Sequence, residues 1–229
     1  MKEFLNRISR LQTDSFPSQA ALYRKLAHGQ SPKALMISCA DSRVAPELIT
    51  QAAPGELFVC RNAGNIVPPF SQANGGVSSV VEYAVVALGV TDIVVCGHSD
   101  CGAMKAFLQP DKLAEMPNVA AWLRHSHAAH SVVCQAYPNL DEKAHVRALA
   151  LENVVAQINH LRTHPSVAAA IAQGRLTLHG WFFDIETCGI LALDGETGRF
   201  TAVGEEALPV AVAPQRRLAA DDALMVAAE

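Results

Sequence analysis

The sequence predicts an α/β protein with a mainly parallel sheet of four to five strands flanked by helices. Apolar runs of strand length alternate with longer segments whose apolar residues recur at helical spacing. The strand-length runs have too little polar alternation for one face to lie in water, which is typical of parallel sheets. This order implies right-handed crossovers and helices over both faces. The 229 residues suit one large domain and are fewer than two would need, so 1–229 is expected to be a single domain.

The expected elements follow from these patterns in chain order. Residues 1–30 form an amphipathic arm of two helices, 1–11 and 17–27, which packs either on its own sheet or on a neighbouring chain. Strands are expected over 34–39, 57–61, 91–98 and 176–184, and 190–193 with 200–203 forms a hairpin. Helices are expected over 46–51, 77–88, 101–108, 118–129, 140–163 and 166–173. About 205–229 is expected to be a loosely held tail.

Composition excludes several classes of protein. Apolar residues make up 50% and charged residues 17% of the chain, the balance of a well-packed globular enzyme. The formal charge of -4 comes without a basic stripe, so nucleic acid is not an expected partner. No apolar run is long enough for a membrane span, and no signal peptide is visible, which favours the cytoplasm. In that compartment the six cysteines are expected to be thiols or metal ligands.

Chemically active side chains follow two of the expected strands. Cys39, Asp41 and Arg43 come directly after the first strand, and His98 and Cys101 close the third. Open α/β sheets place their ligand sites at the carboxyl ends of strands, so these side chains should meet. Two thiolates and one imidazole form a ligand set that zinc favours. A His-x-x-Cys pair alone is weak evidence, and its conjunction with Cys-x-Asp-x-Arg makes the zinc hypothesis strong.

Asp41 decides which kind of zinc site this is. As a fourth ligand it closes the metal; standing off, it accepts a hydrogen bond from a metal-bound hydroxide while Arg43 holds it in a bidentate pair. An ordinary ion pair at a strand end is the simpler alternative. Two thiolates donate charge to the metal, so the activity is expected to favour alkaline pH.

Three motifs carry a family resemblance. Cys-x-Asp-Ser-Arg at 39–43, Phe-Val-x-Arg-Asn-Ala-Gly-Asn at 58–65 and Gly-His-x-x-Cys-Gly at 97–102 resemble the β-class carbonic anhydrases. These zinc enzymes interconvert carbon dioxide and bicarbonate. The similarity runs from about residue 30 to 181, and segments 46–50, 62–68 and 101–104 look most like the bacterial branch encoded with cyanase.

The resemblance implies roles for individual residues. Cys39, His98 and Cys101 match the zinc ligands, and Asp41 with Arg43 matches the dyad that orients the zinc-bound hydroxide, the nucleophile. Gln30 matches a glutamine that hydrogen-bonds substrate from the partner subunit, and the exchanged N-terminal arm of the family implies at least a homodimer. The positions that line the small carbon dioxide pocket are Phe58, Ala63, Tyr83 and Gly102.

One branch of that family is inhibited by bicarbonate, and this chain departs from it. That branch carries a tryptophan and a tyrosine where this sequence has Met36 and Phe183, and only its arginine is kept, as Arg61. We therefore expect an open form with Asp41 paired to Arg43 and no bicarbonate effector pocket.

Other interpretations compete with this one. A hydrolase of carbon disulfide or carbonyl sulfide on the same scaffold would need an insertion near the entrance, and none is seen at 62–76. A structural zinc protein would leave the Asp-Arg dyad idle. A nucleobase deaminase would need a His-x-Glu motif, which is absent. The sequence identifies no proton shuttle and does not separate dimer from tetramer, or cyanate breakdown from pH balance or carboxylation supply.

Some histidines and cysteines lie outside these motifs. His125, His127 and His130 crowd one helix, where a solvated helix face is the simpler interpretation and a metal at His127 and His130 the alternative. Three cysteines lie in or beside apolar strands and are expected to be small buried hydrophobes: Cys60, Cys96 and Cys188. A fourth, Cys134, lies in a less certain region and is a candidate for exposure.

Overall fold

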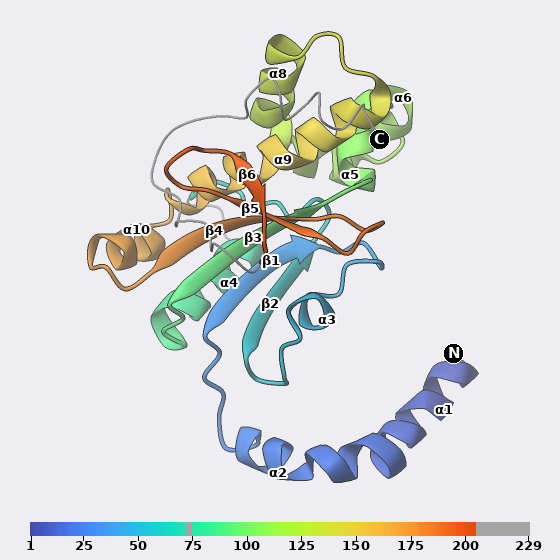
Figure 1. Cartoon of the computed structure of the whole chain (residues 1–229), viewed down its shortest axis with the longest axis vertical. Helices are drawn as coiled ribbons and strands as arrows, with labels where there is room; N and C mark the ends of the chain where they lie inside the picture. The colour runs from blue at the N-terminus through green and yellow to red at the C-terminus, as the bar shows by residue number, and fades with distance from the viewer. Residues whose placement is uncertain (72–74, 205–229) are drawn as a thin grey trace.

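A six-stranded sheet forms the centre of the molecule (Figure 1). The computed structural model describes residues 1–71 and 75–204. The strand order is β2-β1-β3-β4-β5-β6. The strands are β1 Ala34–Cys39, β2 Leu57–Asn62, β3 Asp92–His98, β4 Thr177–Phe183, β5 Ile190–Leu193 and β6 Phe200–Ala202. The mainly parallel α/β fold is confirmed, and the sheet exceeds the expected four to five strands because both arms of the hairpin join it.

The first four strands are parallel, and their carboxyl ends lie at one edge. β1 pairs with β2 so that Cys39 lies opposite Asn62, and β3 pairs with β4 so that His98 lies opposite Phe183. β1 and β3 are adjacent, with Ser38 opposite Cys96. The residues that follow β1 and β3 therefore leave the sheet side by side.

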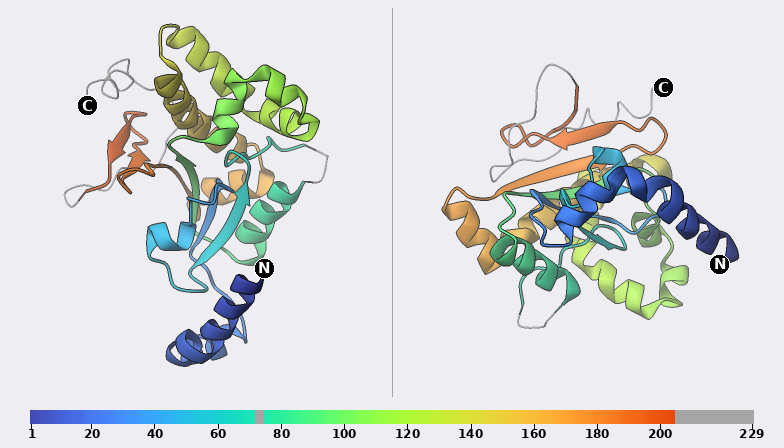
Figure 2. Two further views of the ribbon diagram at one scale, coloured as in Figure 1. Left: turned by 90° about the vertical axis from the view of Figure 1, so that its right-hand side faces the viewer. Right: turned by 90° about the horizontal axis from the view of Figure 1, so that it is seen from below.

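Helices α4 (Gly76–Glu82), α9 (Glu142–Leu161) and α10 (Pro165–Ala172) pack on one face of the sheet, where Figure 2 shows α4 and α10, and the short helix α3 (Pro46–Thr50) lies on the other face. Side chains alternate across β1: Leu35 and Ile37 pack with α4, α9 and α10, whereas Met36 packs on the opposite face with Val44 and Phe183. Both faces are apolar because the strands are buried on both sides. The helices are α1 Lys2–Arg10, α2 Phe16–Leu26, α3 Pro46–Thr50, α4 Gly76–Glu82, α5 Gly102–Lys105, α6 Pro110–Ala114, α7 Pro117–Leu123, α8 His127–Ala136, α9 Glu142–Leu161 and α10 Pro165–Ala172.

The long helix α9 lies close against the sheet because two strand positions lack a side chain. A Cβ placed on Gly97 of β3 would lie 2.8 Å from Cγ2 of Val154, and one on Gly180 of β4 would lie 2.9 Å from Cδ1 of Ile158. Gly97 directly precedes His98. Close packing of α9 therefore sets the backbone position from which His98 projects.

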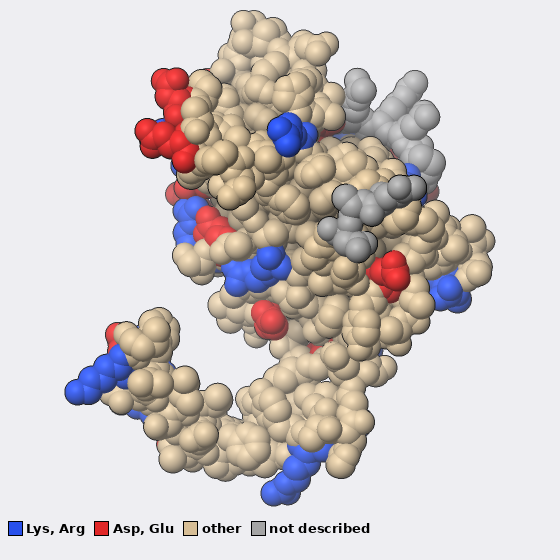
Figure 3. All heavy atoms as spheres, turned by 180° about the vertical axis from the view of Figure 1, so that it is seen from behind, with Lys and Arg blue, Asp and Glu red and all other residues tan. Residues whose placement is uncertain are grey.

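The N-terminal arm differs from its expected form. A π-helical turn over Leu11–Ser15 joins α1 to α2, so the arm is one continuous helical segment rather than two separate helices. Its apolar side chains are exposed, including Phe4 at 61% and Leu5 at 58%. Figure 3 shows the arm standing clear of the rest of the chain, with few charged side chains along its middle. Within this chain the arm therefore does not cover its own sheet.

The remaining cysteines divide by environment. Cys96 is fully buried, as expected, and burial raises the pKa of its thiol to about 12. Cys60 is half-buried. Cys188 is exposed, contrary to expectation, because it lies in the turn before β5 with a left-handed backbone φ of 57°. The expected tail at 205–229 lies outside the described residues, and in the part described no helix has the length and apolar character needed to cross a bilayer.

Candidate active site

Three buried side chains meet at the carboxyl edge of β1 and β3. Cys39 ends β1, His98 ends β3, and Cys101 immediately precedes α5. One ligand atom from each lies within 4.8 Å of the other two. The expected helix after Cys101 is present as α5 continued by a 3-10 turn over Ala106–Leu108. Cys39 and His98 are 59 residues apart in the sequence, and the pairing of β1 with β3 brings them together at the carboxyl ends of these strands.

The ring of His98 is oriented for metal binding. Its Nδ1 lies 2.8 Å from the carbonyl oxygen of Ser99, and since a carbonyl only accepts, Nδ1 carries the proton. The Nε2 atom is then an unprotonated acceptor, and it is buried with no hydrogen-bond partner in the described structure. A buried orphan of this kind needs an explanation, and a metal ion supplies it. The donor set fits zinc.

A hydrogen bond between the two thiols favours the thiolate form of Cys39 and the protonated form of Cys101. The hydrogen bond from Cys101 is the main cause that lowers the pKa of Cys39, and the same bond raises the pKa of Cys101. The backbone N–H of Gly64 also donates to Cys39 Sγ, at 3.4 Å. Gly64 has a left-handed φ of +79°, and an added Cβ would lie 3.1 Å from Met104 Cε. Without a metal, the pair carries one negative charge. A bound divalent cation would balance the charge of two thiolates.

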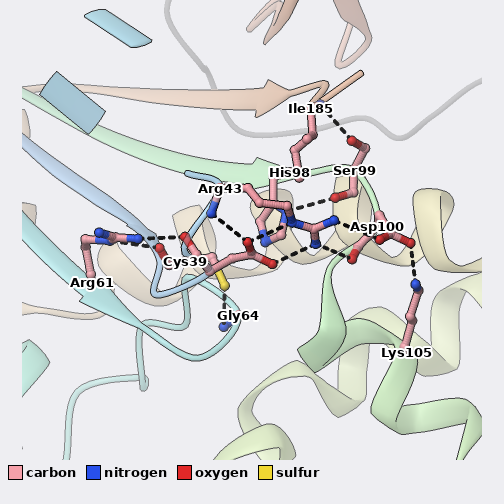
Figure 4. Close-up of polar contacts among 10 residues, drawn as sticks. Cys39, Arg43, Arg61, Gly64, His98, Ser99, Asp100, Lys105 and Ile185 are labelled. Carbon is pink, nitrogen blue, oxygen red and sulfur yellow. Dashed lines mark hydrogen bonds and ion pairs between the residues drawn. The ribbon is translucent and has the colours of Figure 1, made fainter. Parts of the chain in front are cut away.

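Asp41 and Arg43 form the bidentate pair that the sequence suggested (Figure 4). Arg43 donates from Nε to Asp41 Oδ1 at 3.0 Å and from Nη2 to Oδ2 at 2.8 Å. The backbone N–H of Arg43 adds a third bond to Oδ1, at 3.0 Å. The Arg43 side-chain hydrogen bonds hold the pKa of Asp41 well below its usual range. The carboxylate therefore stays ionised and acts only as an acceptor.

Two further residues, Asp100 and Lys105, were not among the expected site residues. Arg43 Nη1 donates to Asp100 Oδ2 at 3.1 Å, and Lys105 forms an ion pair with the same carboxylate. Asp100 adopts a left-handed φ of 58°, which turns its side chain back toward Arg43. Hydrogen bonds from Lys105 and then Arg43 lower the pKa of Asp100. The dyad is thus part of a chain of charges that runs from Asp41 to α5.

Arg61 binds the backbone of the segment 39–41, which contains Asp41 of the dyad. Its Nε donates to the carbonyl of Cys39 at 3.1 Å, and its Nη2 donates to the carbonyl of Asp41 at 2.7 Å. Its partners in this structure are therefore backbone oxygens.

Met36 and Phe183 stand where the bicarbonate-inhibited branch has a tryptophan and a tyrosine. Both are buried and pack in one apolar cluster.

The expected pocket residues fall into two groups. Ala63 precedes Gly64, the residue that contacts Cys39, and Gly102 begins α5 beside Cys101. Phe58 lies near the opposite end of β2 and its ring is 5.9 Å from that of exposed Tyr83. Gln30 is exposed and precedes the amino end of β1, whereas Cys39 is at the carboxyl end. Within one chain, Gln30, Phe58 and Tyr83 are not brought to the cluster.

Comparisons with known proteins agree with this site. The family model for carbonic anhydrase matches residues 34–190. A carbonic anhydrase of Pseudomonas aeruginosa is 53% identical over 205 residues, covering 90% of this chain and 93% of the relative. The solved β-carbonic anhydrase CcaA has a TM-score of 0.87 at 42% identity and covers 90% of this chain and 93% of its own. One of two tetrameric β-carbonic anhydrases from Sordaria macrospora has a TM-score of 0.72 at 32% identity, covering 84% of this chain and 98% of its own.

Fold, donor set and relatives define a zinc-dependent lyase that hydrates carbon dioxide to bicarbonate. The chain belongs to the carbonic anhydrase family, in its β class.

Proposed function

We propose that this enzyme hydrates carbon dioxide from an open form of its site, in which Cys39, His98 and Cys101 are the protein ligands. The observation that carries the proposal is the two-pronged hydrogen bonding of Asp41 by Arg43. Zinc held there supplies a Lewis acid that lowers the pKa of water. Because both oxygens of Asp41 are engaged by Arg43, the carboxylate is held back as an acceptor that orients an O–H group and leaves the fourth position open.

The surroundings of the cluster suit a small uncharged substrate. Ala63 and Gly102 add no polar side chain, and a Cβ built on Gly102 would meet nothing within 4 Å. We propose that a small linear molecule, which offers little to bind, approaches the cluster past these two residues. Backbone N–H groups beside it can stabilise charge that develops on the product oxygens.

A second copy of the chain is proposed to complete the pocket. Gln30, Phe58 and Tyr83 lie away from the cluster of their own chain, and Tyr83 is 52% exposed. The apolar arm is also uncovered. A homodimer, or a higher oligomer like the tetrameric Sordaria macrospora relative, would bury the arm and deliver Gln30 across the interface.

The enzyme is further proposed to lack bicarbonate inhibition. Buried Met36 and Phe183 fill the place where an effector would need polar groups, and Arg61 already donates to the carbonyls of Cys39 and Asp41. An anion there would have to displace these bonds in a largely apolar setting.

We also propose a cellular compartment and a pathway for the enzyme. The six cysteines are free thiols in the structure, which supports a reducing compartment such as the cytoplasm. Segments 46–50, 62–68 and 101–104 support the branch encoded with cyanase. Loss of growth on cyanate in a strain lacking the chain, restored by high carbon dioxide, would support that branch, and unchanged growth would contradict it.

Stopped-flow hydration of carbon dioxide on protein of known zinc content tests the open form. Hydration proportional to bound zinc, at neutral as well as alkaline pH and with a pH profile that added bicarbonate does not shift, is the expected result. Activity that appears only at alkaline pH, with bicarbonate shifting that threshold upward, would instead mean that Asp41 closes the site.

A further inference from the structure

A second group of potential metal ligands lies on α8 and α9, apart from the catalytic cluster. His130 and Cys134 are one helical turn apart on α8, and His145 comes from α9, which packs against α8. One ligand atom from each residue lies within 4.8 Å of the other two. The Nε2 atom of His130 is 3.4 Å from Cys134 Sγ. Two helices thus converge three metal-binding groups on one point.

The rings in this group are held in place. His130 stacks on Phe107 with centroids 4.8 Å apart and planes at 24°, and its centroid lies 5.7 Å from that of His145. Neighbouring Ala129 and Val133 are buried and anchor this part of α8. Packing therefore limits the side-chain freedom that metal binding would otherwise have to remove.

His145 carries an unexplained polar atom. Its Nε2 is buried and has no hydrogen-bond partner in the described structure. A buried ring nitrogen without a partner costs free energy, and a cation bound by the lone pair of the neutral ring removes that cost. Burial also lowers the pKa of His130 and His145, which favours the neutral rings that bind metals.

The geometry fits zinc with little adjustment. Ligand atoms about 2.0–2.3 Å from a tetrahedral zinc lie roughly 3.3–3.8 Å from one another. The 3.4 Å separation of His130 Nε2 and Cys134 Sγ is already in that range. Cys134 is exposed, so rotation of its short side chain can close the remaining separation and solvent can reach the fourth position.

We propose that His130, Cys134 and His145 form a second, non-catalytic zinc site with a solvent-facing fourth position. The site differs from the pair suggested by sequence spacing, His127 with His130, because the Nδ1 atom of His127 faces Ser131 Oγ at 3.4 Å instead. Its ligand set of one thiolate and two imidazoles is of the kind that holds zinc rather than magnesium or calcium. By joining α8 to α9 the ion would fix the helical layer that contacts β3 and β4.

Metal counting on the untagged, full-length enzyme tests the proposal. Protein stripped with a chelator, reloaded with zinc and freed of excess is expected to hold two zinc ions per chain. Cys134→Ser and His145→Gln are each expected to hold one and to keep carbon dioxide hydration unchanged. Cys188→Ser is the matched control, since it also removes an exposed thiol but lies outside both clusters, and it should hold two.

Loading with cobalt separates the two sites spectroscopically. Cys39→Ser is expected to lose hydration yet keep one cobalt with a thiolate charge-transfer band, and the double variant with Cys134→Ser should lose that band. One metal per chain in wild type, or two in every variant of the second cluster, would overturn the proposal, and so would loss of the second metal in His127→Gln. Near-UV circular dichroism confirms that each variant is folded. A failure of carbon dioxide hydration in wild type would contradict the proposed function alone, because the second site is read by metal content.

Discussion

The guanidinium of Arg43 grips both carboxylate oxygens of Asp41, from Nε at 3.0 Å and from Nη2 at 2.8 Å. Because the two residues are separated only by Ser42, the pair is set by local chain geometry as well as by charge. It keeps Asp41 ionised, and the planar guanidinium fixes the orientation of the carboxylate through two parallel hydrogen bonds, which a lysine cannot form. We expect the reactivity of the site to depend on this orientation.

Replacement of Arg43 by lysine is expected to lower kcat/KM for carbon dioxide hydration about 100-fold, in the range typical of lost acid–base positioning. Lysine keeps the charge but offers one donor group in place of the fork. Zinc content should be unchanged, since Arg43 contacts no ligand side chain. Stopped-flow kinetics with metal analysis measures both quantities, and wild-type activity in Arg43→Lys would show that the pair is idle.

Asp100→Asn should have a much smaller effect on hydration. The Asp100 carboxylate pairs with Arg43 and Lys105, but its side chain is 53% exposed, so solvent screens the interaction. Exposed pairs contribute about 0.2–1 kcal/mol, equivalent to a loss in kcat/KM of up to about fivefold. Asparagine tolerates the left-handed backbone at this position. A loss as large as that of Arg43→Lys would mean that Asp100 acts directly on substrate.

Mixing two inactive variants tests whether Gln30 acts across an interface. Gln30→Ala leaves its own zinc ligands intact, whereas Cys39→Ser removes one ligand and keeps Gln30. If Gln30 serves the partner's site, a mixed dimer contains one site with intact ligands and an intact glutamine. Hydration should therefore reappear when the variants are unfolded and refolded together.

The expected recovery is up to about one quarter of wild-type activity, since half of the chains pair unlike and half of their sites are complete. Each variant refolded alone is the control. No recovery, with mixed dimers demonstrated by mass spectrometry, would place Gln30 in its own chain's site or outside catalysis.

Sequence patterns predicted the parts of this structure that depend on local chemistry. The apolar run that ends at Cys39 and the one that ends at His98 became adjacent parallel strands. Because such strands deliver their ends to one edge, the metal cluster followed from two short motifs. The bidentate Asp41–Arg43 pair also followed, since its members are two residues apart.

Features that depend on tertiary packing or unusual backbone were missed. Asp100 meets Arg43 only because its φ is 58°, a conformation that the sequence does not reveal. The apolar neighbours of Cys188 predict a buried position, although a tight turn exposes it. The meeting of His145 with α8 depends on how α9 packs, and the spacing of histidines within α8 could not show it.

The ion pair between Arg147 and Asp184 should make stability depend on pH. Arg147 Nη1 lies 2.8 Å from Asp184 Oδ2, and both side chains are mostly buried, so this pair joins α9 to the segment after β4. Burial alone would raise the pKa of Asp184, but hydrogen bonds from Arg147, Thr187 and Glu186 outweigh it and lower the pKa. A lowered carboxyl pKa in the folded state stabilises the protein above the unfolded value of about 4, and this contribution is lost as pH falls through the folded value.

Arg147→Met is therefore expected to reduce the free energy of unfolding by about 1–3 kcal/mol at neutral pH. The difference from wild type should shrink as pH falls below about 4, where Asp184 becomes protonated in both proteins. Part of the difference in the free energy of unfolding remains at low pH because Arg147 also lies over the Phe182 ring, with its Cζ atom 4.8 Å from the ring centroid. Urea unfolding across this pH range measures the trend, with Asp184→Asn as the matched control. A difference between Arg147→Met and wild type that stays constant with pH would show that ring packing, and not the ion pair, is what Arg147 contributes.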